Sequence, residues 1–143
     1  MSIDQISVFL ENRTGQLAEI THLLADNGID LRAISIAETA DYGILRIIAD
    51  DAERAATILL THGNILTMTP VMVVGVPDEP SSLSNLLALI AEGDIGIEYM
   101  YSLFTHANGK AYMVFRVAEE EKLTALLDSH GIAPVMKDEL GLK

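Results

Sequence analysis

Residues 12–17, Asn12-Arg13-Thr14-Gly15-Gln16-Leu17, form a polar stretch with one glycine between two different hydrophobic patterns. Apolar residues alternate with polar ones over residues 5–10, which predicts a strand buried on one face. From Leu17 onward, apolar residues recur at helical spacing. A strand-to-helix turn leaves the first N–H groups of its helix without intrahelical partners, at the positive end of the helix dipole. The stretch therefore predicts a turn that can hold a small anion.

The same pattern returns in the second half of the chain. Asp78-Glu79-Pro80-Ser81-Ser82-Leu83 separates a valine-rich alternation at residues 71–76 from a second helical pattern. Leu17 and Leu83 align at an offset of 66 residues, and the offset is 68 between His62-Gly63 and His130-Gly131. A repeat of this length predicts two small domains, residues 1–70 and 71–143.

Each repeat predicts the element order βαββαβ. In the first repeat we expect strands at residues 3–10, 29–33, 44–49 and 65–68, with helices at 17–27 and 50–62. In the second we expect strands at 71–76, 95–104, 111–117 and near 134–136, with helices at 83–91 and 119–129. Such a unit with right-handed crossovers closes as a four-stranded antiparallel sheet with both helices on one face, the ferredoxin-like arrangement. The fold class expected is α+β.

Composition narrows the functional classes. Half of the residues are hydrophobic and the mean hydropathy is positive, so much apolar surface should be buried between the repeats. The sequence has no apolar run of about 18 residues and no signal-peptide pattern, from which we expect a cytoplasmic protein without a membrane partner. Because cysteine is absent, disulfides and thiolate chemistry are excluded.

The charge is strongly acidic in both halves. The net charge is −12, from 9 basic and 21 acidic residues, and each half carries −6. Such a surface repels nucleic acid at long range, and no cluster of Lys and Arg with interleaved aromatics provides a local exception. We therefore expect no nucleic-acid partner.

The stretch Glu11-Asn12-Arg13-Thr14-Gly15-Gln16-Leu17, followed by Gly28-Ile29-Asp30-Leu31 and the βαββαβ period, resembles the ACT domain, a small-molecule regulatory module of amino-acid metabolism. The resemblance covers both repeats and is closest to the serine-sensing regulatory domain of phosphoglycerate dehydrogenase, which has proline at the place of Thr14. It implies that the two ACT units join side by side into an eight-stranded antiparallel sheet with helices on one face, and that an allosteric effector binds at their interface.

The resemblance also implies which residues contact the effector: the strand-to-helix turn of one unit and the second strand of the other. In the first repeat these are Leu10, Asn12, Arg13, Thr14, Gly15, Gln16, Leu17, Asp30 and Ser35. In the second they are Asp78, Pro80, Ser81, Ser82, Leu83, Met100, Tyr101 and Ser102.

Three departures from the family pattern bear on specificity. Leu10 stands where the dehydrogenase module has a histidine, so serine specificity does not transfer. Ser81 replaces the expected glycine, and Gly96 stands where the first repeat has Asp30, at the place of an asparagine that binds the effector's amino group. We therefore expect two sites that are not equivalent.

Ordinary structural roles explain most of the other polar clusters. Asp50-Asp51 and Glu119-Glu120-Glu121 begin predicted helices, where the dipole favours carboxylates. Asp30 is typical of a solvated strand position, and residues 12–17 also suit a simple helix cap. The four histidines have no metal-ligand spacing, and no nucleophile with a base, phosphate loop or dinucleotide motif is present. We expect no catalytic residues, no metal and no cofactor.

Two hypotheses of function remain open. The first is a regulatory sensor whose effector is a free amino acid, with a metabolic enzyme of amino-acid metabolism and a second copy of the chain as candidate partners. The alternative is a ligand-free protein-interaction or oligomerisation module that regulates a partner enzyme, which the high apolar fraction favours.

Overall fold

A computed structural model describes residues 2–11, 13–38 and 41–143, with the backbone alone at 106 and 107. Asn12 lies outside the described residues. The chain forms two compact units. The N-terminal unit contains Asp4–Thr69 together with Gly141–Lys143, and the C-terminal unit contains Pro70–Leu140 together with the first residues up to Ile3.

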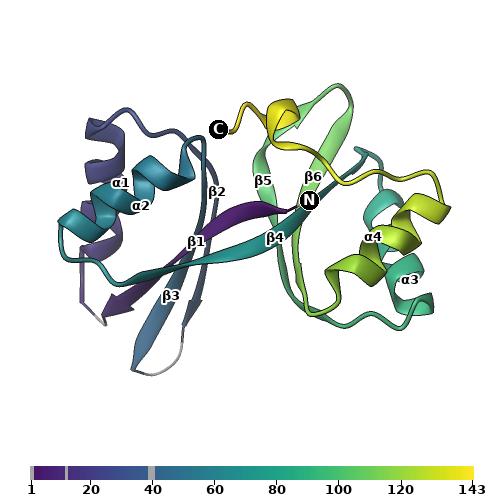
Figure 1. Ribbon diagram of the computed structural model, residues 1–143, viewed down its shortest axis with the longest axis horizontal. Helices are drawn as coiled ribbons and strands as arrows, with labels where there is room; N and C mark the ends of the chain where they lie inside the picture. Colours follow the sequence, from purple (N-terminus) through teal and green to yellow (C-terminus); the bar gives the residue numbers. More distant parts are fainter. Residues whose placement is uncertain (1, 12, 39–40) are drawn as a thin grey trace. The chain divides into compact units, whose positions relative to one another are not determined.

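The N-terminal unit has the expected element order. Its strands are β1 (Ile3–Glu11), β2 (Leu31–Glu38), β3 (Tyr42–Ala49) and the first part of β4 (Leu66–Pro77), and its helices are α1 (Gln16–Asp26) and α2 (Ala52–Thr61). The strand order is β2-β3-β1-β4. β3 pairs antiparallel with both β1 and β2, and Ile47 lies opposite Ile6 and Ile34. This order and both helices on one side of the sheet (Figure 1) are ferredoxin-like, as predicted.

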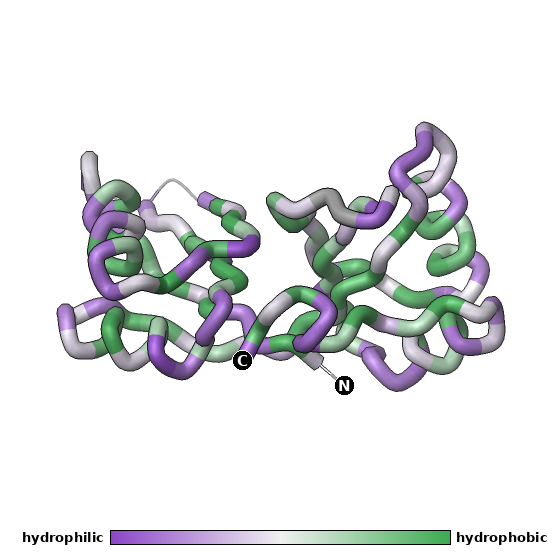
Figure 2. The backbone as a smooth tube through the Cα atoms, turned by 90° about the horizontal axis from the view of Figure 1, so that it is seen from above, coloured by the Kyte–Doolittle hydropathy of each residue, from purple (hydrophilic) through white to green (hydrophobic). Residues whose placement is uncertain are grey.

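The core of this unit lies between the sheet and the two helices. The alternation in β1 turns Ile6, Val8 and Leu10 toward Ile20 and Leu24 of α1, in one buried cluster. The exposed face of α1 carries Glu19, His22 and Asp26, and Figure 2 shows hydrophilic and hydrophobic stretches alternating along the backbone. The apolar residues whose spacing predicted the strand and the helix therefore pack against each other in this core.

The C-terminal unit repeats the pattern. It contains the second part of β4, α3 (Ser82–Glu92), β5 (Ile97–Ala107), β6 (Lys110–Val117), α4 (Glu120–Ser129) and the 3₁₀ helix η1 (Lys137–Leu140), with the strand order β4-β6-β5. Its core packs Val74 and Phe115 of the sheet against Ile90 and Leu127 of the helices. The Asn108-Gly109 tip between β5 and β6 has φ of 56° and 72°, the left-handed pair that a tight hairpin turn needs.

The expectation of an eight-stranded sheet is wrong, since the described residues form six strands. The strands expected at 65–68 and 71–76 are one strand, β4, because Pro70 is compatible with extended backbone and its carbonyl accepts a hydrogen bond from Arg116 Nη1 at 3.0 Å. The strand expected near 134–136 does not form. Pro134 has no N–H to donate, and the following Val135 N–H bonds to Val73 O at 2.8 Å before the chain turns into η1.

Candidate functional site

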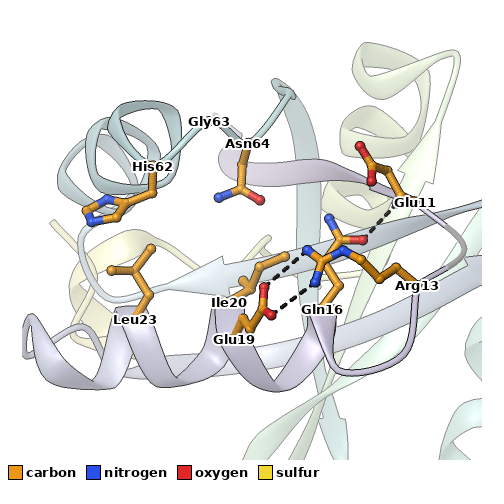
Figure 3. A pocket seen from close by; sticks show the side chains of 9 residues that line it. All are labelled: Glu11, Arg13, Gln16, Glu19, Ile20, Leu23, His62, Gly63 and Asn64. Atoms are coloured by element: carbon orange, nitrogen blue, oxygen red, sulfur yellow. Dashed lines mark hydrogen bonds and ion pairs between the residues drawn. The ribbon is translucent and has the colours of Figure 1, made fainter.

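A cavity of about 340 Å³ lies beside the predicted turn in the N-terminal unit. We call it the N-terminal cavity. Three segments form its walls: the end of β1 with the turn, one face of α1, and the turn that follows α2 (Figure 3). The lining residues are Glu11, Arg13, Gln16, Glu19, Ile20, Leu23, His62, Gly63 and Asn64. Four of its side chains are therefore ionisable, and two carry amides.

The backbone of the turn is held by short-range hydrogen bonds. Arg13 N–H donates to Glu11 O at 2.8 Å, and Glu19 N–H donates to Gly15 O at 3.0 Å, the first bond of α1. Gly15 has φ of +90°, a conformation in which a side chain is strained. No side chain caps this helix end among the described residues. The glycine thus lets the chain turn sharply into α1 and leaves the helix N-terminus open.

Gln16 is fixed between β1 and α1. Its side chain is buried, the residue being 8% exposed, and Oε1 accepts the Glu11 N–H at 2.8 Å. The amide nitrogen Nε2 has no acceptor among the residues that the structure describes. Because Oε1 is anchored, the amide nitrogen is held in the cavity wall as a donor.

Arg13 and Glu19 form a two-bond ion pair in the same wall. Arg13 Nη1 and Nη2 donate to Glu19 Oε1 and Oε2 at 3.0 and 3.1 Å. These hydrogen bonds, and next the positive charge of Arg13, lower the pKa of the Glu19 carboxyl below its ordinary value. Glu19 is therefore ionised at neutral pH.

The turn after α2 supplies the opposite wall. His62 Nδ1 lies 2.9 Å from Ile58 O, and since a carbonyl only accepts, Nδ1 carries the proton. Asn64 Nδ2 donates to Leu59 O at 3.1 Å, which leaves its Oδ1 as an acceptor. Neither residue was among the site residues predicted from the sequence. The signal was the recurrence of His-Gly at the end of the second helix in both repeats.

A second cavity, of about 640 Å³, lies at the corresponding place in the C-terminal unit. We call it the C-terminal cavity. Its walls include the repeat partners of the N-terminal residues, with Glu79 for Arg13, Ser82 for Gln16, Asn85 for Glu19 and His130 for His62. The turn repeats the backbone bonds too, since Glu79 N–H donates to Pro77 O at 2.8 Å and Asn85 N–H to Ser81 O at 2.9 Å. The two cavities are thus equivalent in construction.

Their chemistry differs. The N-terminal cavity has a guanidinium in its wall, whereas the described wall of the C-terminal cavity contains no arginine or lysine and includes Glu79 and Glu92. The N-cap Ser81 has φ of −91°, in contrast to the left-handed Gly15.

The predicted site residues divide into two groups. Arg13 and Gln16 line the N-terminal cavity, and Ser81 and Ser82 line the C-terminal one. Most of the others lie elsewhere in their units. Leu10 is in the core, Leu17 packs against it, and the exposed Asp30 carboxylate pairs with Arg32 Nε at 3.0 Å.

The second-strand residues lie in neither cavity wall. Ser35 pairs with Arg46 across β2 and β3, Tyr101 stacks on Tyr99 at 6.4 Å, and Met100 packs against the C-terminal core. Thr14, Asp78, Pro80 and Ser102 are exposed, and Leu83 is half-buried. Effector contact by these residues stays a prediction.

Two classes of site find no support in the described residues. Neither a group of three or more side chains able to hold a metal ion nor a helix long and apolar enough to span a membrane occurs there. The walls of the two cavities carry charged side chains and hydrogen-bonding groups.

Comparison with known proteins places this geometry in context. A family model described as an ACT domain pair matches residues 1–140. Protein BT0572 from Bacteroides thetaiotaomicron, known from a crystal structure, is 34% identical in sequence to this chain. The alignment covers 99% of this chain and 96% of BT0572, and the two structures superpose with a TM-score of 0.89. The ligand-free regulatory subunit of aspartate kinase from Thermus thermophilus is 17% identical over 88% of this chain and 91% of that one, with a TM-score of 0.62, a likeness of fold. No curated protein matches the sequence.

Proposed function

The chain belongs to the ACT domain pair family, as its turn and its repeat predicted, and on this premise we propose that it is a regulatory protein that binds a free amino acid in the N-terminal cavity. One observation carries the proposal. A cavity lies at the β1–α1 turn, and its wall combines the open helix N-terminus with fixed donors and with carboxylates. A free amino acid carries both charges for which such a wall has partners.

The two ends of an amino acid would find different partners. The carboxylate docks near Gly15, where the helix dipole is positive and Gln16 Nε2 is a fixed donor. The ammonium group faces the Glu11 carboxylate and Asn64 Oδ1 across the cavity. We assign the ammonium to Glu11 rather than to Asp30, because the Asp30 carboxylate pairs with Arg32 and lies outside the cavity wall. A volume of about 340 Å³ falls at the lower end of the range for small-molecule pockets, about 300–1,000 Å³.

Isothermal titration calorimetry against the twenty amino acids tests the proposal. We expect at least one to bind, and Gly15→Asp to abolish its binding, because the new carboxylate stands at the helix N-terminus and repels the ligand's own. Gly28→Asp is the matched control. Gly28 also has positive φ, 70° against 90° at Gly15, with open space around it, but it follows the C-terminal end of α1, whereas Gly15 directly precedes Gln16 of the cavity wall.

The control separates loss of the site from loss of the fold. Gly28→Asp should bind like the wild type, whereas equal loss of binding in both variants would indicate unfolding rather than a site at Gly15. If no amino acid binds the wild type at millimolar concentration, the proposal is wrong.

A second candidate function is favoured by exposed apolar side chains of the N-terminal unit. Phe9 and Tyr42 stack with their ring centroids 5.3 Å apart and are still 37% and 41% exposed. Contiguous exposed apolar patches mark protein-interaction surfaces in general. We propose self-association or docking of a partner enzyme as the alternative. Light scattering over a range of concentrations would detect self-association, which Phe9→Ser should weaken.

A further inference from the structure

Glu19 makes with Arg13 the contact that a carboxylate ligand would make. Two parallel N–H···O bonds, of 3.0 and 3.1 Å, join the guanidinium to both carboxylate oxygens. This two-bond geometry is the one by which arginine recognises carboxylates in general. Both side chains belong to the wall of the N-terminal cavity (Figure 3). The cationic group of the cavity is therefore already bound to a carboxylate of the protein.

A second donor in the same wall remains without an acceptor. Gln16 is more than nine-tenths buried, its Oε1 is anchored by the Glu11 N–H, and its Nε2 has no acceptor among the described residues. Figure 3 shows this amide on the same side of α1 as the Arg13 guanidinium. Nε2 itself is accessible to water. A ligand oxygen that meets Nε2 replaces this water and makes a hydrogen bond that Glu19 does not supply.

We propose that Glu19 is an internal substitute for the ligand's carboxylate: it occupies Arg13 in the free protein, and a small-molecule carboxylate displaces it and binds to Arg13 and Gln16 Nε2. This inference rests on the proposed function and adds to it the group that is recognised and the side chain that competes with it. The affinity of the site for the ligand then depends on how much more favourably the ligand's carboxylate binds to Arg13 and Gln16 than the Glu19 carboxylate binds to Arg13.

Because the ion pair is exposed, separating Glu19 from Arg13 costs little free energy. The Arg13 and Glu19 side chains are 48% and 64% exposed, so the released carboxylate of Glu19 can rotate into water. Ion pairs of such exposure contribute little to stability in general, because water and salt compete for both charges. A ligand carboxylate gives up hydrogen bonds to water when it binds. Its contacts with Gln16 and with the positive end of the helix dipole, in addition to Arg13, more than offset this free-energy cost.

The C-terminal cavity cannot make this exchange. Glu79 and Asn85 stand in place of Arg13 and Glu19, and Ser82 stands in place of Gln16. Neither the cation nor the competing carboxylate is present at these positions. Displacement by a carboxylate is therefore confined to the N-terminal cavity.

Calorimetry on four variants tests the exchange, with the amino acid that binds the wild type most tightly as the probe. Glu19→Gln should bind it about two to five times more tightly, the range expected on removing an exposed competitor of this kind. Glu53→Gln is the matched control. It makes the same chemical change at an exposed position of α2 outside the cavity wall, so it should bind the amino acid like the wild type.

Arg13 must be the group for which the two carboxylates compete. Arg13→Gln should weaken binding, and adding Glu19→Gln to it should give no further gain, because no cation is left to release. The carboxamide of the same amino acid should bind more weakly than the amino acid to every variant that retains Arg13.

The outcomes separate this inference from the proposed function. If an amino acid binds the wild type and Glu19→Gln binds it no more tightly than Glu53→Gln does, the exchange is wrong and the proposed function stands. If no amino acid binds any variant, the proposed function fails, and acetate becomes the probe. Acetate should then shift the side-chain amide resonances of Gln16 in Glu19→Gln more than in the wild type, and an equal or absent shift would overturn the exchange.

Discussion

Gly15 and Ser81 stand at the same place in the two repeats, and the φ angles of their backbones have opposite signs, +90° and −91°. Each carbonyl nevertheless accepts the first bond of its helix, from Glu19 N–H at 3.0 Å and from Asn85 N–H at 2.9 Å. The same hydrogen bonding is thus reached by two backbone conformations, and only the conformation in the first repeat requires glycine.

Substitution by alanine should distinguish the two caps. Gly15→Ala places a Cβ on a left-handed residue, which costs about 1–2 kcal/mol of unfolding free energy. Ser81→Ala should change it by less than about 0.5 kcal/mol, because the Ser81 side chain makes no capping bond and is exposed. Urea denaturation of the two variants and the wild type measures the difference, and equal costs would contradict it.

The Arg13–Glu19 pair should be visible in solution as a titration. Because the guanidinium lowers the pKa of Glu19, its side-chain carboxyl carbon should titrate in NMR below the ordinary glutamate range. Arg13→Gln should move the titration back up. An unchanged titration would show that the pair does not persist in water.

The sign of the pH effect on stability follows from the same pair. A depressed folded-state pKa stabilises the native protein at pH values above the ordinary glutamate pKa, and this contribution is lost as the pH falls through the lowered value. Between neutral pH and the acid range, the wild type should lose stability relative to Arg13→Gln. A constant difference between the two denaturation midpoints over that range would be the contrary result.

Gly75 lies close to the ring of Tyr112 in the C-terminal unit. A Cβ on Gly75 would lie 3.1 and 3.3 Å from two ring carbons of Tyr112, which is 6% exposed and has little room to move. Gly75→Ala should therefore destabilise the protein by about 1–3 kcal/mol, as overpacking does. Gly96→Ala is the control, because nothing lies within 4 Å of its added Cβ. Thermal or urea unfolding should show a cost for the first variant alone.

Arg116 ties β6 to its neighbours, and lysine should not replace it. Its Nη1 donates to Pro70 O at 3.0 Å and its Nε lies 3.2 Å from Glu98 Oε2. A lysine cannot make both contacts, so Arg116→Lys should cost about 1 kcal/mol. Arg54→Lys, at an exposed position of α2, should be neutral in the same denaturation assay. Equal stability of the two variants would argue that the Pro70 contact contributes nothing.

Local sequence signals predicted most of the elements. The turn at residues 12–17 was predictable because it depends on left-handed backbone at a single residue, Gly15. The number of strands could not be predicted from local signals in this way. A proline in an extended segment ends a strand only if the missing N–H was needed by a neighbouring strand, and the identity of that neighbour is a tertiary property.

The candidate site shows the same division. The sequence predicted a ligand-binding turn at residues 12–17, and Arg13 and Gln16 of this turn do lie in a cavity wall. It did not reveal that the Glu19 carboxylate would pair with the Arg13 guanidinium. Nor did it reveal that the turn after α2, with His62 and Asn64, would form the opposite wall of the cavity. Those contacts join segments that are far apart in the chain or side chains whose rotamers depend on packing.

By itself, then, the sequence determined the repeat, the ferredoxin-like units, the family and the unequal chemistry of the two turns, because periodicity, glycine positions and residue types are local properties of the chain. Only the tertiary structure decided that Pro70 continues a strand, that two matching cavities lie at the turns, and that a carboxylate of the protein already holds Arg13. These depend on which groups meet across space, where hydrogen-bond geometry and burial select one partner among several.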